Sequence, residues 1–314
     1  MEVHVRAQRR GRSFTKTVKW LFSYRYLYLM LVPAFVVLAL FAYGPMYGAI
    51  IAFKNYNPFF GIWGSPWVGL QHFNKLFGNM FFQRIFSNTV KISLLNLAWG
   101  FPAPILLALM LNELRSRKYK RTIQTITYMP HFLSWVIIGG FMINLFSPSK
   151  GLIKSIMSML GRDYNRALLA EPGMFRSMLV GSSIWQSVGW GSIIYLAAIA
   201  GIDPELYEAA EIDGAGRLRK VLSITLPGIS TTIAVLLILR VGGIMNTNFE
   251  QIFLLYNPSV YSVGDVFATY VYREGLMKAS FSYTTAIGLF QSSVNFALIL
   301  ITNAIARKLG KGMW

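Results

Sequence analysis

The chain has 314 residues, of which 54% are hydrophobic and only 13% charged, and its mean hydropathy is +0.48. This composition is typical of an integral membrane protein in contact with lipid and excludes an ordinary soluble domain. The formal net charge of +18 would suit nucleic acid, but the basic residues stand at the ends of apolar runs, so no nucleic-acid partner is expected.

A window of roughly 19 residues predicts an all-α fold, a polytopic membrane helical bundle with six transmembrane helices. The predicted spans cover residues 27–48, 88–111, 125–146, 177–200, 229–248 and 284–306. The chain then divides into a basic N-terminal arm (1–26), a transmembrane domain (27–306) and a short tail (307–314). We find no internal repeat or low-complexity linker between the spans, which favours one packed bundle.

Lys and Arg are concentrated in the segments that lie on one side of the membrane if the spans alternate. These segments are the N-terminal arm, the loops 112–124 and 201–228, and the C-terminal tail. The bias of positive charge toward the cytoplasm predicts that both termini are cytoplasmic. The basic residues concerned are Arg6, Arg9, Arg10, Arg12, Lys16, Lys19, Arg25, Arg115, Arg117, Lys118, Lys120, Arg121, Arg217, Arg219, Lys220, Arg307, Lys308 and Lys311.

Sequence signatures of catalysis and of metal binding are missing. The chain has no Cys, its three histidines are far apart, and we find no nucleotide phosphate loop, zinc-hydrolase pair or serine nucleophile elbow. We therefore expect a non-catalytic subunit with no metal and no cofactor of its own. The 12 acidic residues all lie in loops or at span ends, which disfavours a proton-driven carrier.

The loop between the fourth and fifth predicted spans has the local signals of two short helices. Asp203 can cap the first turn, and Pro204 suits the first helical position. Gly214 can supply the left-handed turn that ends a helix of roughly 10 residues. A second short helix is predicted over roughly 216–224, ending ahead of Pro227. Small side chains on one face of the first helix would let another surface approach closely, so the loop is interpreted as a docking element.

The same loop, residues 203–227, carries the pattern E-A-A-x-x-D-G-A with a downstream I-x-L-P. It resembles the EAA loop of the inner-membrane permease subunits of binding-protein-dependent ABC importers. Val221 stands where that family often has an aromatic residue. The matching residues are Glu208, Ala209, Ala210, Asp213, Gly214, Ala215, Ile224, Leu226 and Pro227.

This resemblance implies a type I ABC importer permease fold in the bacterial inner membrane, with cytoplasmic EAA coupling helices that dock on ATPase subunits. It implies as partners a second, related permease, two ATP-binding subunits and an extracytoplasmic solute-binding protein. Mg-ATP and its hydrolysis would belong to the ATP-binding subunits. This chain would form half of a translocation path that works by alternating access.

The likeness covers essentially the whole chain and looks like the carbohydrate-uptake branch typified by the maltose transporter membrane subunits. Further segments are similar to permeases for complex or acidic oligosaccharides, including alginate and aldouronate importers. A neutral oligosaccharide stays an alternative substrate. A self-contained secondary carrier or channel, or a membrane enzyme or scaffold, would leave the EAA loop unexplained. The segments concerned are Gly44-Pro45-Met46-Tyr47-Gly48, Ala52-Phe53-Lys54-Asn55-Tyr56-Asn57-Pro58, Tyr270-Val271-Tyr272-Arg273 and Gly288-Leu289-Phe290.

Polar and aromatic side chains within the predicted spans are candidates for a sugar path, because buried amides need hydrogen-bond partners and sugar faces stack on rings. The amides would serve equally well to join helices, and Trp190 would also suit a membrane interface. Arg240 has two interpretations, attraction of uronate carboxylates or snorkelling to the outer interface. The candidates are Trp185, Gln186, Trp190, Arg240, Gln291, Ser292 and Asn295.

Overall fold

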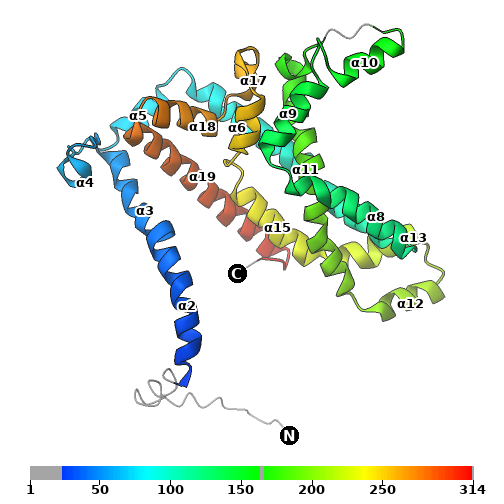
Figure 1. Ribbon diagram of the computed structural model, residues 1–314. Helices are drawn as coiled ribbons and strands as arrows, with labels where there is room; N and C mark the ends of the chain where they lie inside the picture. The colour runs from blue at the N-terminus through cyan, green and yellow to red at the C-terminus, as the bar shows by residue number, and fades with distance from the viewer. Residues whose placement is uncertain (1–22, 163–165, 313–314) are drawn as a thin grey trace.

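The structure, a computed structural model, describes residues 23–162 and 166–312, and these ranges are almost entirely helical (Figure 1). The basic arm predicted over residues 1–26 therefore lies mostly outside the described residues. Within the described part, 4 helical segments are long and apolar enough to cross a membrane, and two bent helix pairs raise the total to as many as 6. This count is consistent with the prediction of six spans.

The first long segment comprises α2 and α3 with the turns that follow them, and the second comprises α6 and α7. The third and fourth are the single helices α11 and α19. The bounds of the α-helices are α2 (Arg25–Leu38), α3 (Gly44–Met46), α4 (Gly61–Gly64), α5 (Gln71–Phe77), α6 (Phe82–Gly100), α7 (Pro102–Asn112), α8 (Arg117–Tyr128), α9 (Trp135–Leu145), α10 (Leu152–Met159), α11 (Pro172–Ala200), α12 (Pro204–Ile212), α13 (Arg217–Lys220), α14 (Leu226–Gly228), α15 (Ser230–Gly242), α16 (Phe249–Leu255), α17 (Tyr261–Gly264), α18 (Phe267–Val271) and α19 (Phe281–Lys308). The 3-10 helices are Tyr47–Phe53, Met129–Phe132, Leu168–Ala170 and Pro258–Val260, and the π-helical turns are Ala39–Tyr43, Val221–Thr225 and Tyr272–Met277.

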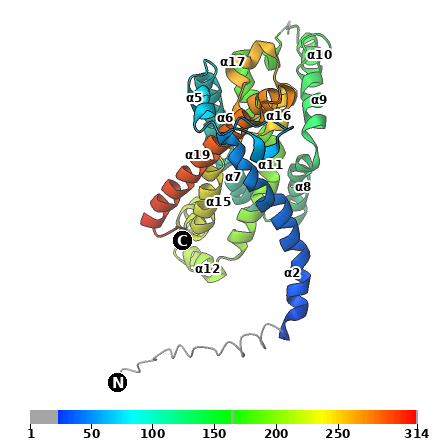
Figure 2. The same cartoon turned by 90° about the vertical axis from the view of Figure 1, so that its left-hand side faces the viewer.

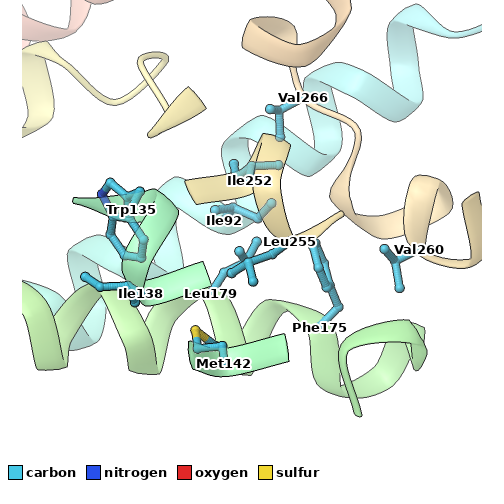
Figure 3. Packing of buried hydrophobic residues seen from close by; sticks show 10 residues of the cluster. All are labelled: Ile92, Trp135, Ile138, Met142, Phe175, Leu179, Ile252, Leu255, Val260 and Val266. Carbon is cyan, nitrogen blue, oxygen red and sulfur yellow. The ribbon is translucent and has the colours of Figure 1, made fainter. Parts of the chain in front are cut away.

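Helix α11 is the centre of the packing and contacts α6, α7 and α8. Phe175 and Leu179 of α11 belong to a buried apolar cluster that also holds Ile92 of α6 and Ile252 of α16 (Figure 3). A second cluster joins α7 and α11 to Ile229, directly after the loop that carries the EAA pattern. The loop is therefore anchored in the helical core.

The two ends of the molecule carry different elements. Helices α12 and α13 lie at one end, and α10 and α17 at the other (Figures 1 and 2). The start of α2 and the last turns of α19 point toward the end that carries α12. Helix α2 departs from the single packed bundle that the sequence favours, because none of its residues is buried and it runs away from the other helices (Figure 1). The 3-10 helix Tyr47–Phe53 packs on α19 and joins this first span to the rest.

The third predicted span, 125–146, is not one straight helix. Helix α8 and its 3-10 extension Met129–Phe132 end at a break, after which α9 continues at 101°. Pro130 lies in that 3-10 turn, and Ser134 starts a new helix by accepting a hydrogen bond from the Ile137 N–H at 3.4 Å. A proline followed by a new N-cap explains why this span is bent.

The fifth predicted span, 229–248, ends at Gly242 and therefore earlier than predicted. The backbone that follows is freed from helical hydrogen bonding and finds partners on α19. The Met245 N–H donates to Asn295 Oδ1 at 3.0 Å, and Gln291 Nε2 donates to the Met245 carbonyl at 3.0 Å. Non-helical backbone is tolerated at membrane depth where neighbouring groups satisfy it in this way.

The sequence predicts that the second short helix of the loop ends ahead of Pro227, and this prediction is wrong. Helix α13 continues through the π-helical turn Val221–Thr225 into α14, which contains Pro227. A proline ring normally clashes with the carbonyl four residues earlier, and the wider π-helical turn relieves this clash. The chain then bends by 61° before α15 begins.

Candidate functional site

The first helix of the EAA loop forms where its local signals predict it. Helix α12 begins at Pro204, and the Asp203 side chain accepts a hydrogen bond from the Glu205 N–H at 3.0 Å. The helix ends at Ile212, and Gly214 follows with a φ of +73°. That left-handed conformation favours glycine and turns the chain sharply toward α13. The predicted cap, start and turn are confirmed.

Two side-chain contacts fasten α12 to the helix that follows the turn. The hydroxyls of Tyr207 and Thr225 lie 2.9 Å apart, and Lys220 Nζ donates to Glu211 Oε1 at 2.6 Å. The hydrogen bond and the charge of Lys220 hold the pKa of Glu211 below its ordinary value, so the ion pair persists until that carboxylate is protonated in acid. Because Glu211 is exposed, the half-buried Tyr207–Thr225 contact is the stronger restraint. The loop is therefore one braced unit.

The surface of this braced loop is unusually apolar for an exposed element. Ile212 is 89% exposed and Leu218 72% exposed. Glu208 makes no hydrogen bond or ion pair with any described residue. The half-buried residues Ala210 and Ala215 line a small hollow of ≈ 150 Å³ between the two helices. Exposed apolar side chains at this end of the molecule suit a protein–protein contact.

A polar cavity of ≈ 440 Å³ lies between α6, α11 and the end of α15. Arg240 lines it from the last turn of α15, where a cation suits the carbonyl end of the helix. Asn96 Oδ1 and Thr247 Oγ1 are buried and have no hydrogen-bond partner within the described residues. No carboxylate lines this cavity in the part of the chain that the structure describes. The polar residues around it are Ser93, Asn96, Ser183, Gln186, Ser187, Arg240, Asn246, Thr247, Asn248 and Gln251.

The structure brings only two of the candidate path residues together at this cavity, Gln186 and Arg240. Trp185 lines a separate, mostly apolar groove of ≈ 590 Å³ between α9 and α11. Trp190 stacks on the His131 ring, with the ring centroids 4.7 Å apart and the planes at 6°. The two tryptophans therefore lie outside the cavity lining.

The candidates on α19 also lie outside the cavity lining. Gln291 and Asn295 bind the backbone of Met245, and Ser292 is exposed. Asn295 Nδ2 donates to Asn246 Oδ1 at 3.3 Å, so Asn295 touches a cavity residue. In this chain the two α19 amides shape the broken end of α15.

The polar residues that follow α15 are not among the candidates predicted from the sequence. Asn246, Thr247 and Asn248 line the cavity and are separated from the pair Gly242-Gly243 by Ile244 and Met245. Two glycines and, a short way on, three consecutive polar residues inside an apolar run are the signal that points to this break. Asn96 lies in the second span, where no comparable signal marks it.

Comparison with known proteins gives concordant results. Residues 100–311 match the family model described as binding-protein-dependent transport system inner membrane component. Protein LplB of Bacillus subtilis (strain 168) is 46% identical over 297 residues, which are 93% of this chain and 93% of that protein. The polygalacturonan/rhamnogalacturonan transport system permease protein YteP of the same strain is 46% identical over 291 residues, with 93% of this chain and 90% of that protein covered.

Two crystal structures share the fold. One is a bacterial alginate ABC transporter in complex with an alginate pentasaccharide-bound periplasmic protein, with a TM-score of 0.85, 42% identity, and coverage of 94% of this chain and 98% of that chain. The other is a bacterial ABC transporter involved in the import of the acidic polysaccharide alginate, with a TM-score of 0.86, 42% identity, and coverage of 93% and 99%. The predicted all-α permease fold class is confirmed.

Proposed function

This chain belongs to the family of binding-protein-dependent transport system inner membrane components, and we propose that it is the permease subunit of an ATP-driven importer for acidic oligosaccharides. The proposal rests chiefly on one combination. The same chain carries an exposed, internally braced EAA loop and a polar cavity that Arg240 lines. The braced loop suits coupling to a separate ATPase, and the polar cavity suits passage of a hydroxyl-rich anion.

In the proposed coupling, α12 docks into a cleft of a partner ATPase subunit. Its exposed apolar residues and the free Glu208 carboxylate would form the contact, with the residues of the EAA pattern around them. The Tyr207–Thr225 contact would make the loop move as one body. Ile229 is buried with Tyr195 and Ile199 of α11, so movement of the loop would be passed to the central helix. Mg-ATP would be bound and hydrolysed by the partner.

The proposed substrate follows from the chemistry of the cavity. Buried polar atoms that lack a protein partner, such as Asn96 Oδ1 and Thr247 Oγ1, are well suited to hydrogen-bond sugar hydroxyls. Arg240 can bind a carboxylate through paired N–H groups, which would favour uronates over neutral sugars. The relative YteP is named for polygalacturonan and rhamnogalacturonan, and the two crystal structures are of alginate transporters. A neutral oligosaccharide stays the alternative.

The proposed assembly also follows from surfaces that this chain leaves uncovered. Helix α2 is apolar and none of its residues is buried, which fits packing on a second, related permease. The end that carries α10 and α17 would face the solute-binding protein outside the bacterial inner membrane. The opposite end, with α12, the start of α2 and the last turns of α19, would face the cytoplasm (Figures 1 and 2).

Substrate-stimulated ATP hydrolysis by the reconstituted complex tests this function. We expect oligogalacturonates or alginate oligosaccharides, delivered by the solute-binding protein, to raise hydrolysis about tenfold or more over a matched series of neutral oligosaccharides, an effect of about 1.4 kcal/mol. Equal stimulation by neutral sugars would favour the neutral alternative. No response to any oligosaccharide would contradict the proposal, and uptake by this chain without an ATPase would show a secondary carrier.

The variant Arg240→Gln tests the role of charge in the same assay. Loss of a charge-assisted hydrogen bond of about 1.5–3 kcal/mol predicts a selective fall of roughly 10–100-fold for acidic oligosaccharides. Arg240→Lys, which keeps the charge, is the matched control and should retain most of the selectivity. Equal losses for acidic and neutral sugars, or no loss at all, would remove Arg240 from substrate selection.

A further inference from the structure

A second cavity, of ≈ 440 Å³, is lined by residues of α5, α6, α18 and α19 and of the segments next to them. Helices α5 and α18 lie away from the end that carries α12 (Figure 1). Its volume is within the usual range of small-molecule sites. Four cations line it, together with two carboxylates, so its lining carries an excess of positive charge. The charged residues are Lys75, Arg84, Arg273, Lys278, Asp265 and Glu274.

Both carboxylates already have partners. Arg273 forms a two-pronged ion pair with the buried Asp265, at 2.8 Å and 3.3 Å, and Lys278 pairs with Glu274 at 2.8 Å. Arg273 and Lys278 are therefore neutralised within the cavity wall. Lys75 and Arg84 supply the excess charge.

These two remaining cations have unused hydrogen-bonding capacity. Arg84 Nη2 forms a long ion pair with Asp265 Oδ2 at 3.6 Å, without a hydrogen bond, and Arg84 Nε is buried with no hydrogen-bond partner among the described residues. The Lys75 ammonium makes no ion pair in the described part of the chain. A buried donor without a partner is uncommon in folded proteins. Both groups are therefore available to an anion that enters the cavity.

Aromatic rings hold these cations in place. Lys75 Nζ lies 4.9 Å from the centroid of the Tyr283 ring, and Arg84 Cζ lies 4.9 Å from that of Phe81. Asn79 Nδ2 fixes the Tyr283 ring by donating to its hydroxyl at 3.2 Å. Rings that carry cations on their faces are not free to stack on a neutral sugar, whereas pre-positioned cations favour anion binding.

We propose that this outer cavity is a carboxylate-binding subsite, in which Lys75 and Arg84 bind a uronate of the acidic oligosaccharide as it leaves the solute-binding protein. Arginine binds carboxylates through paired N–H groups, and the nearby ammonium adds a second positive charge. This inference rests on the proposed function and adds to it an entry subsite separate from the cavity at Arg240. An acidic side chain of the solute-binding protein offers the same carboxylate chemistry, so the experiment must separate the two sources.

The test uses the complete reconstituted importer and a solute-binding protein loaded with oligogalacturonate, or with alginate oligosaccharide if only that is taken up. We expect the double variant Lys75→Gln/Arg84→Gln to lower uptake of this substrate roughly tenfold, and Lys75→Gln alone to lower it severalfold. The control is Lys150→Gln, an exposed cation between α9 and α10 at the same end of the molecule, which should leave uptake unchanged. Affinity of the ligand-free solute-binding protein for the importer is measured in parallel and should not change.

Unchanged uptake in the double variant would overturn the subsite. If the double variant loses affinity for the ligand-free solute-binding protein by the same factor as it loses uptake, the subsite is also overturned. The carboxylate that binds Lys75 and Arg84 would then belong to that protein. Lys75 makes no ion pair with any described residue, so Lys75→Gln should fold normally. If the double variant does not assemble, uptake by Lys75→Gln alone decides whether the subsite exists. If the wild-type importer takes up no oligosaccharide at all, the proposed function fails, and that result is distinct from failure of the subsite.

Discussion

Replacing Gly214 by valine is expected to uncouple this permease from the proposed partner ATPase, whereas the same replacement at Gly216 is expected to leave coupling intact. Gly214 has a φ of +73°, and Gly216 has a φ of −69°. A Cβ added at either position would meet nothing within 4 Å, so the two sites differ in backbone conformation and not in the space around that atom. A left-handed conformation costs a residue with a side chain roughly 1–2 kcal/mol, and more if it is β-branched.

The expected consequence is a shift in the angle between α12 and α13, because the Ala215 N–H closes the turn by donating to the Ala210 carbonyl at 2.8 Å. We expect Gly214→Val to lower uptake roughly tenfold or more and to lower the amount of ATPase retained in detergent, since one tenfold step corresponds to about 1.4 kcal/mol. Gly216→Val is the control, and its uptake and its co-purification with the ATPase are measured in the same way. Equal behaviour of the two variants would show that the left-handed turn is not needed for coupling.

Replacing Gly189 by alanine is expected to prevent normal packing of α8 against α11. An added Cβ would overlap the carbonyl group of Thr127 and approach Tyr128 Cδ1 to 2.9 Å. The Thr127 carbonyl is a backbone group, so side-chain rotation cannot relieve the overlap and the two helices must separate. Overpacking of this kind costs about 1–3 kcal/mol and occasionally more.

Gly181 provides the matched control for this prediction. It lies in the same helix, and an added Cβ would meet nothing within 4 Å. We expect Gly189→Ala to lower the midpoint of thermal unfolding in detergent and the yield of assembled complex, while Gly181→Ala changes neither. A wild-type melting curve for Gly189→Ala would show that the close approach of the two helices is not required.

The elements that the sequence predicts correctly are those whose signals are local. The Asp203 cap, the proline that follows it and the left-handed Gly214 act within a few residues, and α12 forms where they predict it. The hydropathy pattern also found the spans, because burial in lipid depends on average composition over about 19 residues. The breaks near Pro130 and after Gly242 do not show in the mean hydropathy, because a few turn-forming residues barely change the average over such a window.

The cavity was harder to predict because its residues come together only through tertiary packing. The amides of Gln291 and Asn295 were recognised as unusual within a span, yet their partner is the backbone of Met245 on another segment. No local pattern specifies such a contact. Asn96 likewise acquires its position only when α6, α11 and the end of α15 meet.

The central claim is that α12 is a cytoplasmic helix bound by a separate ATPase, and site-directed crosslinking tests this claim most directly. The natural chain has no Cys, so single cysteines can be introduced without removing others. Ile212→Cys places a thiol on α12 at a residue that is 89% exposed, and Met159→Cys places one on α10 at a residue that is 86% exposed. We predict that a bifunctional maleimide joins Ile212→Cys to the ATPase, while an impermeant maleimide applied to intact cells labels only Met159→Cys. Labelling of Ile212→Cys from outside, or its failure to crosslink in an assembled complex, would contradict the account.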